Sequence, residues 1–184
     1  MISIDDKKKN FAQIVDGKVV DDSERVEVSI KGSISGFRAT IEAIKPGFPF
    51  STTLYIETDV LGEGQKEALF SITVTPRVAK GLSGIIGKLL LLDAREAPTG
   101  SKIFDNEFIA TSNNEAICQR FINYPGVAEK IRTLSRYCGF RELHIQGGKG
   151  LVLVIPNSFD SISYDKVKAS FHELGELAQI LFDF

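Results

Sequence analysis

The sequence predicts an α+β fold in which a mainly antiparallel sheet is covered on one face by helices. Three observations lead to this prediction. Residues 25–75 alternate between apolar and polar, an unbroken apolar strand follows a Gly-Gly turn near residue 150, and later segments have helical periodicity. A sheet with one solvent-exposed face and helices on the other buries the apolar residues of all these segments.

The N-terminal half predicts four amphipathic strands in an antiparallel meander over residues 25–75. Glycine- and proline-rich connections separate these strands, and short connections favour pairing between consecutive strands. The inward positions are Val26, Val28 and Ile30, then Phe37, Ala39, Ile41 and Ala43, then Phe50, Thr52, Leu54 and Ile56, and finally Ala68, Phe70, Ile72 and Val74. Pro76 ends the fourth strand. A weaker helical pattern over residues 4–15 predicts a helix before the meander.

Residues 104–182 predict a β-α-α-β-β-α unit. A strand over residues 107–111 leads into helices within 114–138, which a Tyr-Pro-Gly corner divides. Ser112 or Asn113 is expected to cap the first of these helices, and Gly139 to end the second in the left-handed conformation.

A hairpin and a long helix complete this unit. Gly147-Gly148 is expected to turn a strand containing Leu143 and Ile145 into Leu151–Ile155. Because this second strand has no polar face, protein should cover both of its sides. Ser163 is expected to cap the last helix, over 164–182, which has a regular apolar stripe. No repeat or linker divides the chain, so we predict a single domain over 1–184.

Composition limits the classes of function. The chain has 184 residues, is 43% hydrophobic and 25% charged, and includes 13 Phe, which is enough for a real core. The formal net charge is -2, and the only basic cluster, Lys7-Lys8-Lys9, directly follows Asp5 and Asp6. Nucleic acid is therefore not an expected partner, because phosphate binding needs a concentrated basic face.

The sequence predicts a soluble cytoplasmic protein. Its first residues lack the apolar segment of a signal peptide, and no window has the roughly 18 apolar residues of a spanning helix. Without an export signal, Cys118 and Cys138 are expected to be two reduced thiols rather than a disulfide.

Known cofactor and metal motifs are absent from the sequence. A strand, not a helix, follows Gly147-Gly148-Lys149-Gly150, so this segment is a turn and not a phosphate-binding loop. Gly84-Ile85-Ile86-Gly87 has the outline of an RNA-clamping loop but lies in the most apolar part of the chain. His144 and His172, the only histidines, have no ligand spacing typical of zinc. We predict no cofactor and no metal ion.

Two features leave a functional alternative open. Asp105 and Glu107 would point to the same side of a strand and could divide acid and base roles, although two solvated acids are the more common case. Residues 77–92 have an apolar stripe flanked by Arg77, Lys80 and Lys88. Such a stripe commonly faces the core, but it also suits a protein partner, a second subunit or a membrane surface.

The segment from Phe104 to Ala116, FDNEFIATSNNEA, resembles uncharacterised bacterial proteins known only as domains of unknown function. Their pattern is F-D-x-x-F-x-V, a polar pair, a small-residue helix, a segment rich in Leu and Arg, a glycine hairpin and a C-terminal helix. Ala110 stands where Val is usual, and Ser101 replaces the acid of a T-G-D turn. The resemblance covers roughly residues 32–182 and implies a layout but no activity or functional residues.

The sequence therefore leads to two hypotheses about function. The first is a non-catalytic domain that binds a protein partner or a second copy of itself, with the 77–92 stripe as its contact. The second is a small-molecule-binding protein or hydrolase whose site is assembled in space around the sheet, near Asp105, Glu107 and His144. The catalytic residues of such an enzyme are not identified by the sequence.

Overall fold

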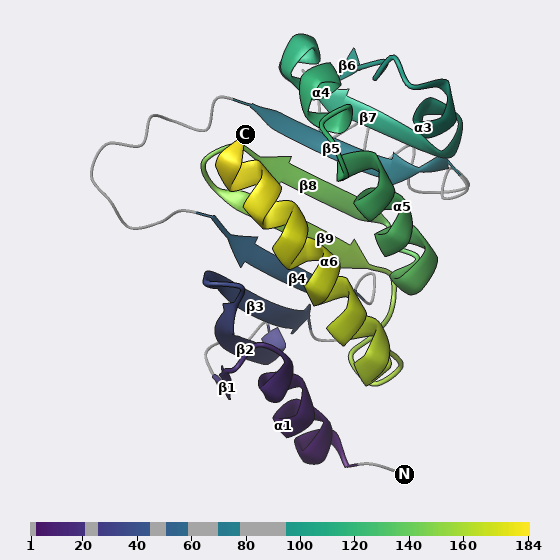
Figure 1. Cartoon of the computed structure of the whole chain (residues 1–184). Helices are drawn as coiled ribbons and strands as arrows, with labels where there is room; N and C mark the ends of the chain where they lie inside the picture. Colours follow the sequence, from purple (N-terminus) through teal and green to yellow (C-terminus); the bar gives the residue numbers. More distant parts are fainter. Residues whose placement is uncertain (1–2, 21–25, 45–50, 59–69, 78–94) are drawn as a thin grey trace.

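The computed structural model describes residues 3–20, 26–44, 51–58, 70–77 and 95–184. These residues form an α+β fold with five helices and one nine-stranded sheet, as predicted (Figure 1). The helices are α1 (Ile4–Ile14), α3 (Lys102–Glu107), α4 (Glu115–Ile122), α5 (Val127–Cys138) and α6 (Tyr164–Asp183). The strands are β1 (Lys18–Val19), β2 (Val26–Ile34), β3 (Phe37–Ile44), β4 (Thr52–Glu57), β5 (Ser71–Pro76), β6 (Arg95–Glu96), β7 (Phe108–Ser112), β8 (Glu142–Gln146) and β9 (Gly150–Ile155).

The sheet is antiparallel throughout, with the strand order β1-β2-β3-β4-β9-β8-β5-β7-β6. The meander therefore contains β2, β3 and β4, but the prediction that the fourth strand continues it is wrong. The β8–β9 hairpin lies between β4 and β5 instead. Period-two alternation identifies strands but not their neighbours, and β9 offers β4 an apolar partner along its full length.

Cross-strand register divides the sheet into an apolar face and a mixed face. Seven directly paired residues on the apolar face are at most 2% exposed: Ile30, Ile41, Leu54, Leu153, Leu143, Val74 and Ala110. The next row, on the opposite face, contains Thr40, Tyr55, Val152, His144, Thr73 and Thr111. Because side chains alternate along each strand, the strand pairing that aligns the first row on one face also aligns the second row on the other face.

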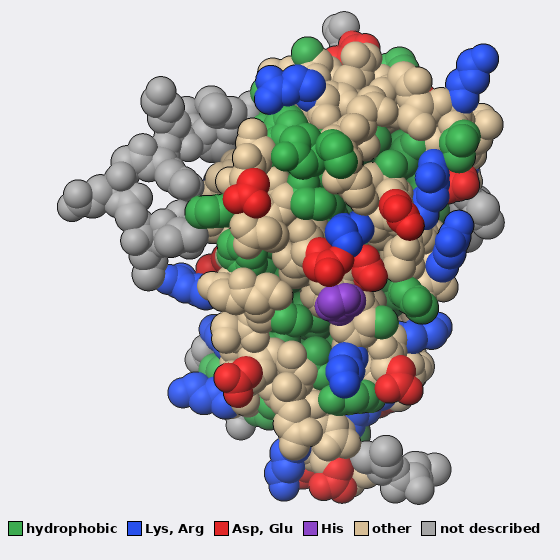
Figure 2. Space-filling view, viewed as in Figure 1, with side chains coloured by type: hydrophobic (Ala, Val, Ile, Leu, Met, Phe, Trp, Pro, Cys, Tyr) green, Lys and Arg blue, Asp and Glu red, His purple; other side chains and the backbone are tan. Residues whose placement is uncertain are grey.

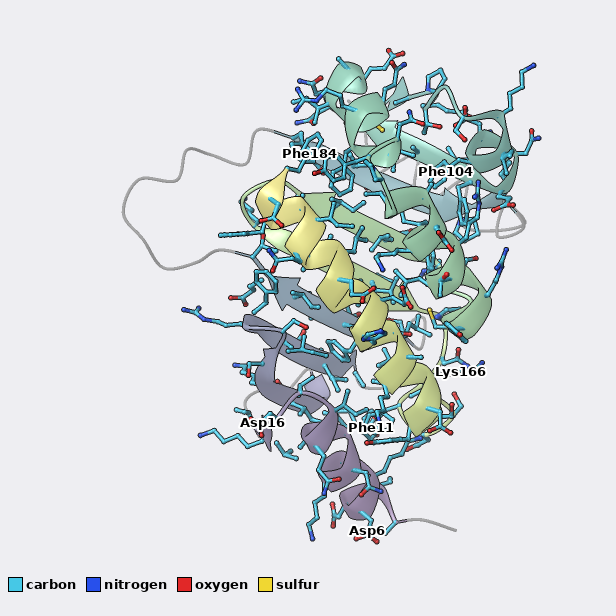
Figure 3. The ribbon with its side chains drawn as sticks, in the orientation of Figure 1. Asp6, Phe11, Asp16, Phe104, Lys166 and Phe184 are labelled. Atoms are coloured by element: carbon cyan, nitrogen blue, oxygen red, sulfur yellow. The ribbon has the colours of Figure 1, made fainter. Side chains whose placement is uncertain are left out.

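Helices α4, α5 and α6 lie over the apolar face, which confirms the predicted layer arrangement (Figure 1). The side of α6 that faces the sheet is fully buried, and its largest side chain there is Phe171. Phe11 lies near the N-terminal half of α6, whereas Phe184 is at the other end of the helix (Figure 3). Phe184 makes edge contacts with Phe70 and Phe121, so aromatic packing joins α6 to α4 there.

Strand β9 is covered less completely than predicted. Leu151, Leu153 and Ile155 are buried under the helices, whereas Val152 and Val154 on the mixed face are only partly buried. No helix in the described ranges lies over that face. An unbroken apolar strand therefore does not, by itself, show that both sides are covered.

Close backbone contact between the end of α1 and β2 covers the edge of the sheet at β2. Gly17, just after α1, approaches Gly32 on β2 so closely that a Cβ atom on Gly32 would lie 2.1 Å from the Val15 carbonyl oxygen. The Ser33 amide donates a hydrogen bond to the same oxygen. Strand β1 continues the contact, so α1 and β1 together cover much of this edge.

Several local predictions are confirmed and two are wrong. Ser163 caps α6, and Gly139 ends α5 with a φ of 59°. The cap of α4 is Asn114, whose side chain accepts from the Ile117 amide, rather than Ser112 or Asn113. Residue 107 belongs to α3 and not to the following strand.

Two further findings concern possible contact with membranes or partners. Among the helices that the structure describes, none has the length and apolar character required to cross a membrane. The predicted stripe at 77–92 lies outside the described residues, except for Arg77.

Candidate functional site

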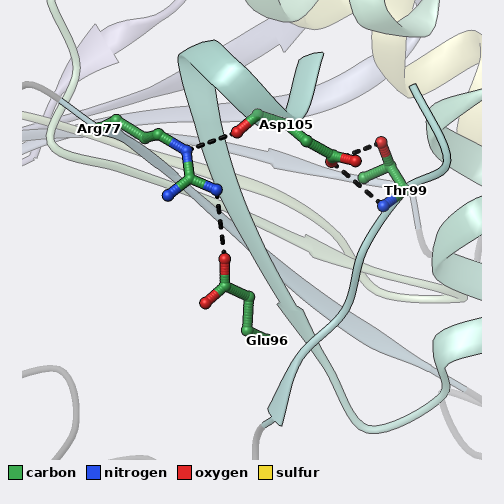
Figure 4. A network of polar contacts seen from close by, with 4 residues as sticks. All are labelled: Arg77, Glu96, Thr99 and Asp105. Carbon is green, nitrogen blue, oxygen red and sulfur yellow. Dashed lines mark hydrogen bonds and ion pairs between the residues drawn. The ribbon is translucent and has the colours of Figure 1, made fainter. Parts of the chain in front are cut away.

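The structure places Asp105 in a local scaffold. Ser101 caps α3, and the helical spacing of Phe104 and Phe108 brings their rings to 4.9 Å between centroids. Asp105 therefore lies on a helix, and its carboxylate accepts hydrogen bonds from the Thr99 amide at 3.1 Å and the Thr99 hydroxyl at 2.7 Å (Figure 4). Thr99 is 1% exposed, so these bonds satisfy buried donors.

Arg77 extends this scaffold to the sheet. Its Nε donates to the backbone oxygen of Asp105, and a second guanidinium nitrogen lies 3.2 Å from Glu96 (Figure 4). The contacts join the end of β5 to α3 and β6. All four residues thus contact one another in one network, which favours a positioning role for Asp105 over acid–base chemistry.

Glu107 is also held by a structural contact. Its carboxylate lies 2.9 Å from Nε of Arg132, an ion pair between α3 and α5. The carboxylates of Asp105 and Glu107 thus have separate partners, and neither contacts His144. The predicted grouping of Asp105, Glu107 and His144 is therefore wrong. It assumed that residues 105 and 107 lay on a strand, where alternate side chains share a face.

His144 has two partners on the mixed face of the sheet. Its Nε2 lies 3.1 Å from Oε2 of Glu142, two residues earlier on β8. Its Nδ1 lies 3.1 Å from Oγ1 of Thr73, which is directly opposite on β5. A carboxylate, an imidazole and a hydroxyl therefore form one hydrogen-bonded chain, which we call the Thr73–His144–Glu142 array.

The charge of Glu142 determines the direction of these hydrogen bonds. The hydrogen bond from His144 lowers the pKa of Glu142, burial opposes this shift, and the charges of His144 and Arg141 add to it. An ionised carboxylate can only accept, so Nε2 of His144 carries the proton. When the ring is neutral, Nδ1 is an acceptor and the Thr73 hydroxyl donates to it. This is the arrangement of a general base hydrogen-bonded to an alcohol.

The array has further polar and apolar neighbours on the same face. Thr111 pairs with Thr73 across β7 and β5, and its hydroxyl oxygen is buried with no hydrogen-bond partner among the described residues. On the other side, Val152 pairs with both His144 and Tyr55. Burial raises the pKa of Tyr55, and the charge and hydrogen bond of Glu42 raise it further.

A second cluster lies on the helix-covered side, where a histidine, acidic groups and a basic group gather near the middle of α6 (Figure 2). Its members are His172, Glu173 and Glu176, whose possible ligand atoms all lie within 4.8 Å of one another. However, Lys130 pairs with both glutamates. Burial lowers the Lys130 pKa, but the hydrogen bond and charge of Glu176, together with Glu173, raise it above its ordinary value. The ammonium group thus neutralises the two carboxylates that a metal ion would need.

The two cysteines are free, as predicted, and both are buried. Burial raises the pKa of Cys118 to about 11, and the nearby charges of Asp105 and Glu115 add to this shift. Burial also raises the pKa of Cys138. Because the thiolate is the nucleophilic form, both thiols are poor candidates for catalysis.

A surface hollow of about 330 Å³ lies at the end of α1 and is lined by residues that include Lys9, Asp16 and Lys18. It is open to solvent. Asp16 and Asp6 lie at opposite ends of α1 (Figure 3). The hollow lies across the sheet from the Thr73–His144–Glu142 array and contains no group from it, so it does not form a substrate pocket for that chemistry.

Sequence reasoning identified His144 but missed its partners. Glu142 could have been found, because residues two apart on a strand share a face. Thr73 could not, because its pairing with His144 depends on the insertion of the hairpin beside β5. No protein-family model matches the chain, and no curated protein matches it. The layout resemblance to bacterial domains of unknown function therefore stays a prediction.

Proposed function

We propose that the protein is a binding domain that docks a protein partner, or a second copy of itself, on the mixed face of its sheet. The observation that carries this proposal is an apolar strip on that face. Tyr55 and Val152 are paired directly across β4 and β9, with Val154 beside them, and all three are partly exposed. Half-buried β-branched and aromatic side chains on a sheet suit packing against another surface.

The edges of the sheet support docking on a face rather than strand addition. The outermost strands, β1 and β6, have two residues each. Beyond β1, the Val15 oxygen accepts from β2, and beyond β6 the Ala97 amide donates to Ala110 on β7. Short, partly covered edges offer few free backbone groups to another chain.

The first sequence hypothesis is thereby favoured, with its contact surface moved from the 77–92 stripe to the mixed face. The hydrolase alternative loses its original basis because Asp105 and Glu107 are engaged elsewhere. A cytoplasmic location belongs to the same proposal. The unpaired thiols of Cys118 and Cys138 support it, since oxidising compartments favour disulfides.

Light scattering after size-exclusion chromatography tests self-association. We expect a wild-type dimer and a Val152→Arg monomer, because a charge in the apolar strip opposes its desolvation. Tyr137→Ser is the matched control: it also alters an exposed large side chain, but on α5, where Tyr137 is 53% exposed. Circular dichroism establishes that both variants are folded.

If the wild type is a monomer, the same variants serve as baits in affinity capture. A protein partner should be retained by the wild type and Tyr137→Ser but lost with Val152→Arg. A strict monomer with no partner that depends on Val152 would refute the proposal.

A further inference from the structure

The Thr73–His144–Glu142 array contains the groups needed for acyl transfer from an ester. We infer that it can hydrolyse small carboxylic esters, with Thr73 as nucleophile, His144 as general base and Glu142 as a positioning residue. This activity goes beyond docking on the same face. It rests on two 3.1 Å contacts, one between Thr73 on β5 and His144 on β8 and one between His144 and Glu142 within β8.

The hydrogen bonds of the array match the roles of its members when the His144 ring is neutral. The ionised Glu142 requires Nε2 of His144 to carry the proton, which leaves Nδ1 free to accept the proton of Thr73. Glu142 also stabilises the imidazolium that forms after this transfer. His144 and Glu142 are the accessible members, with 30% of each side chain exposed, whereas Thr73 is only 8% exposed and lies against His144.

The reaction proceeds by two displacements at the carbonyl carbon. Thr73 Oγ1 forms a bond to this carbon while its proton moves to Nδ1 of His144. The bond to the alcohol oxygen then breaks, and the alcohol leaves with that proton. In the second step a water molecule gives its proton to His144 and attacks the acyl-threonine, and Thr73 Oγ1 recovers the proton as the carboxylic acid leaves. The net reaction is ester plus water to acid plus alcohol.

Thr111 is positioned to assist the first step. It lies directly opposite Thr73 on β7, and its buried hydroxyl has no hydrogen-bond partner in the described part of the chain. A free donor beside the nucleophile can bind the carbonyl oxygen as negative charge develops on it.

p-Nitrophenyl acetate is a suitable probe because release of p-nitrophenolate and acetylation of the protein can be measured separately. We expect a burst of p-nitrophenolate and an acetyl group on Thr73 in peptide mass spectrometry. Thr73→Val removes the hydroxyl at nearly constant shape, and it should abolish the burst and lower the rate at least about tenfold. Thr73→Ser should retain acylation at this position.

The second histidine provides a matched control for simple imidazole catalysis. His172 is on α6, with 71% of its side chain exposed. His172→Gln should leave the burst unchanged, whereas His144→Gln should abolish it. The inference is wrong if Thr73→Val keeps the wild-type burst, if acetyl is absent from Thr73, or if the activity depends on His172. Thermal unfolding of each variant separates loss of chemistry from loss of fold.

Discussion

Replacement of Gly32 by alanine should release α1 and β1 from the edge of the sheet. The added Cβ atom would lie 2.1 Å from the Val15 carbonyl oxygen and 2.7 Å from the Gly17 Cα atom. Both neighbours are backbone atoms, so neither can move aside by a rotamer change. The two segments must separate, and the hydrogen bond from the Ser33 amide to Val15 must lengthen or break.

The expected loss of stability in Gly32→Ala follows from these contacts. Overpacking against rigid neighbours costs about 1–3 kcal/mol, and loss of one backbone hydrogen bond adds about 1 kcal/mol. We therefore expect Gly32→Ala to lower the free energy of unfolding by about 2–4 kcal/mol. Phe11 and Val15, which are at most 1% exposed, should become more accessible as α1 moves away. The uncovered β2 edge should also increase aggregation.

Urea unfolding followed by circular dichroism measures the change in stability, and hydrogen exchange of the Ser33 amide reports on the contact itself. Gly175→Ala is the matched control. Its Cβ atom would meet only the Ser35 side chain, at 3.0 Å, which can rotate away. Alanine also favours a helix by about 1 kcal/mol over glycine, so this variant should be neutral or stabilised. A Gly32→Ala protein within about 0.5 kcal/mol of the wild type, with Ser33 still protected, would refute the reasoning.

Three other predictions concern single polar groups. The pKa of Glu142 is lowered in the folded protein, first by its hydrogen bond with His144, so its stabilisation is present above the unfolded pKa of about 4.3 and is lost as the pH falls through the folded value. Urea titrations should show Glu142→Gln destabilised at pH 7 and closer to wild type near pH 3; a pH-independent difference would contradict this assignment. Thr111→Val should be neutral or stabilising by up to about 1 kcal/mol, because it removes an unpaired buried hydroxyl, and a marked fall in melting temperature would show that the hydroxyl has a partner. Asp105→Ala leaves two Thr99 donors unsatisfied and should cost about 2 kcal/mol in urea unfolding, with no effect on ester hydrolysis; a loss of hydrolysis without a loss of stability would assign Asp105 to the chemistry.

Much of the fold could be predicted because its signals are local. The alternation through Phe37–Ala43, the apolar stripe of α6 and the position of Gly139 each follow from a few neighbouring residues. Helix α3 was missed although its signals are local too, because the spacing of Phe104 and Phe108 suits both a helix and the end of a strand. The hypothesis that Asp105 and Glu107 share one face depended on both residues lying on a strand, and α3 removes that basis.

The sequence alone therefore determined the longer strands and helices and which of their faces are apolar, since side-chain periodicity is a property of each segment, but it missed α3 and the two-residue strands β1 and β6. Only the tertiary structure decided that β5 lies beyond the hairpin, because strand order depends on pairings between residues far apart in the chain. The same pairing joins Thr73 to His144. The candidate site could not have been predicted as a whole, because one of its residues reaches it through β5 and the other two through β8.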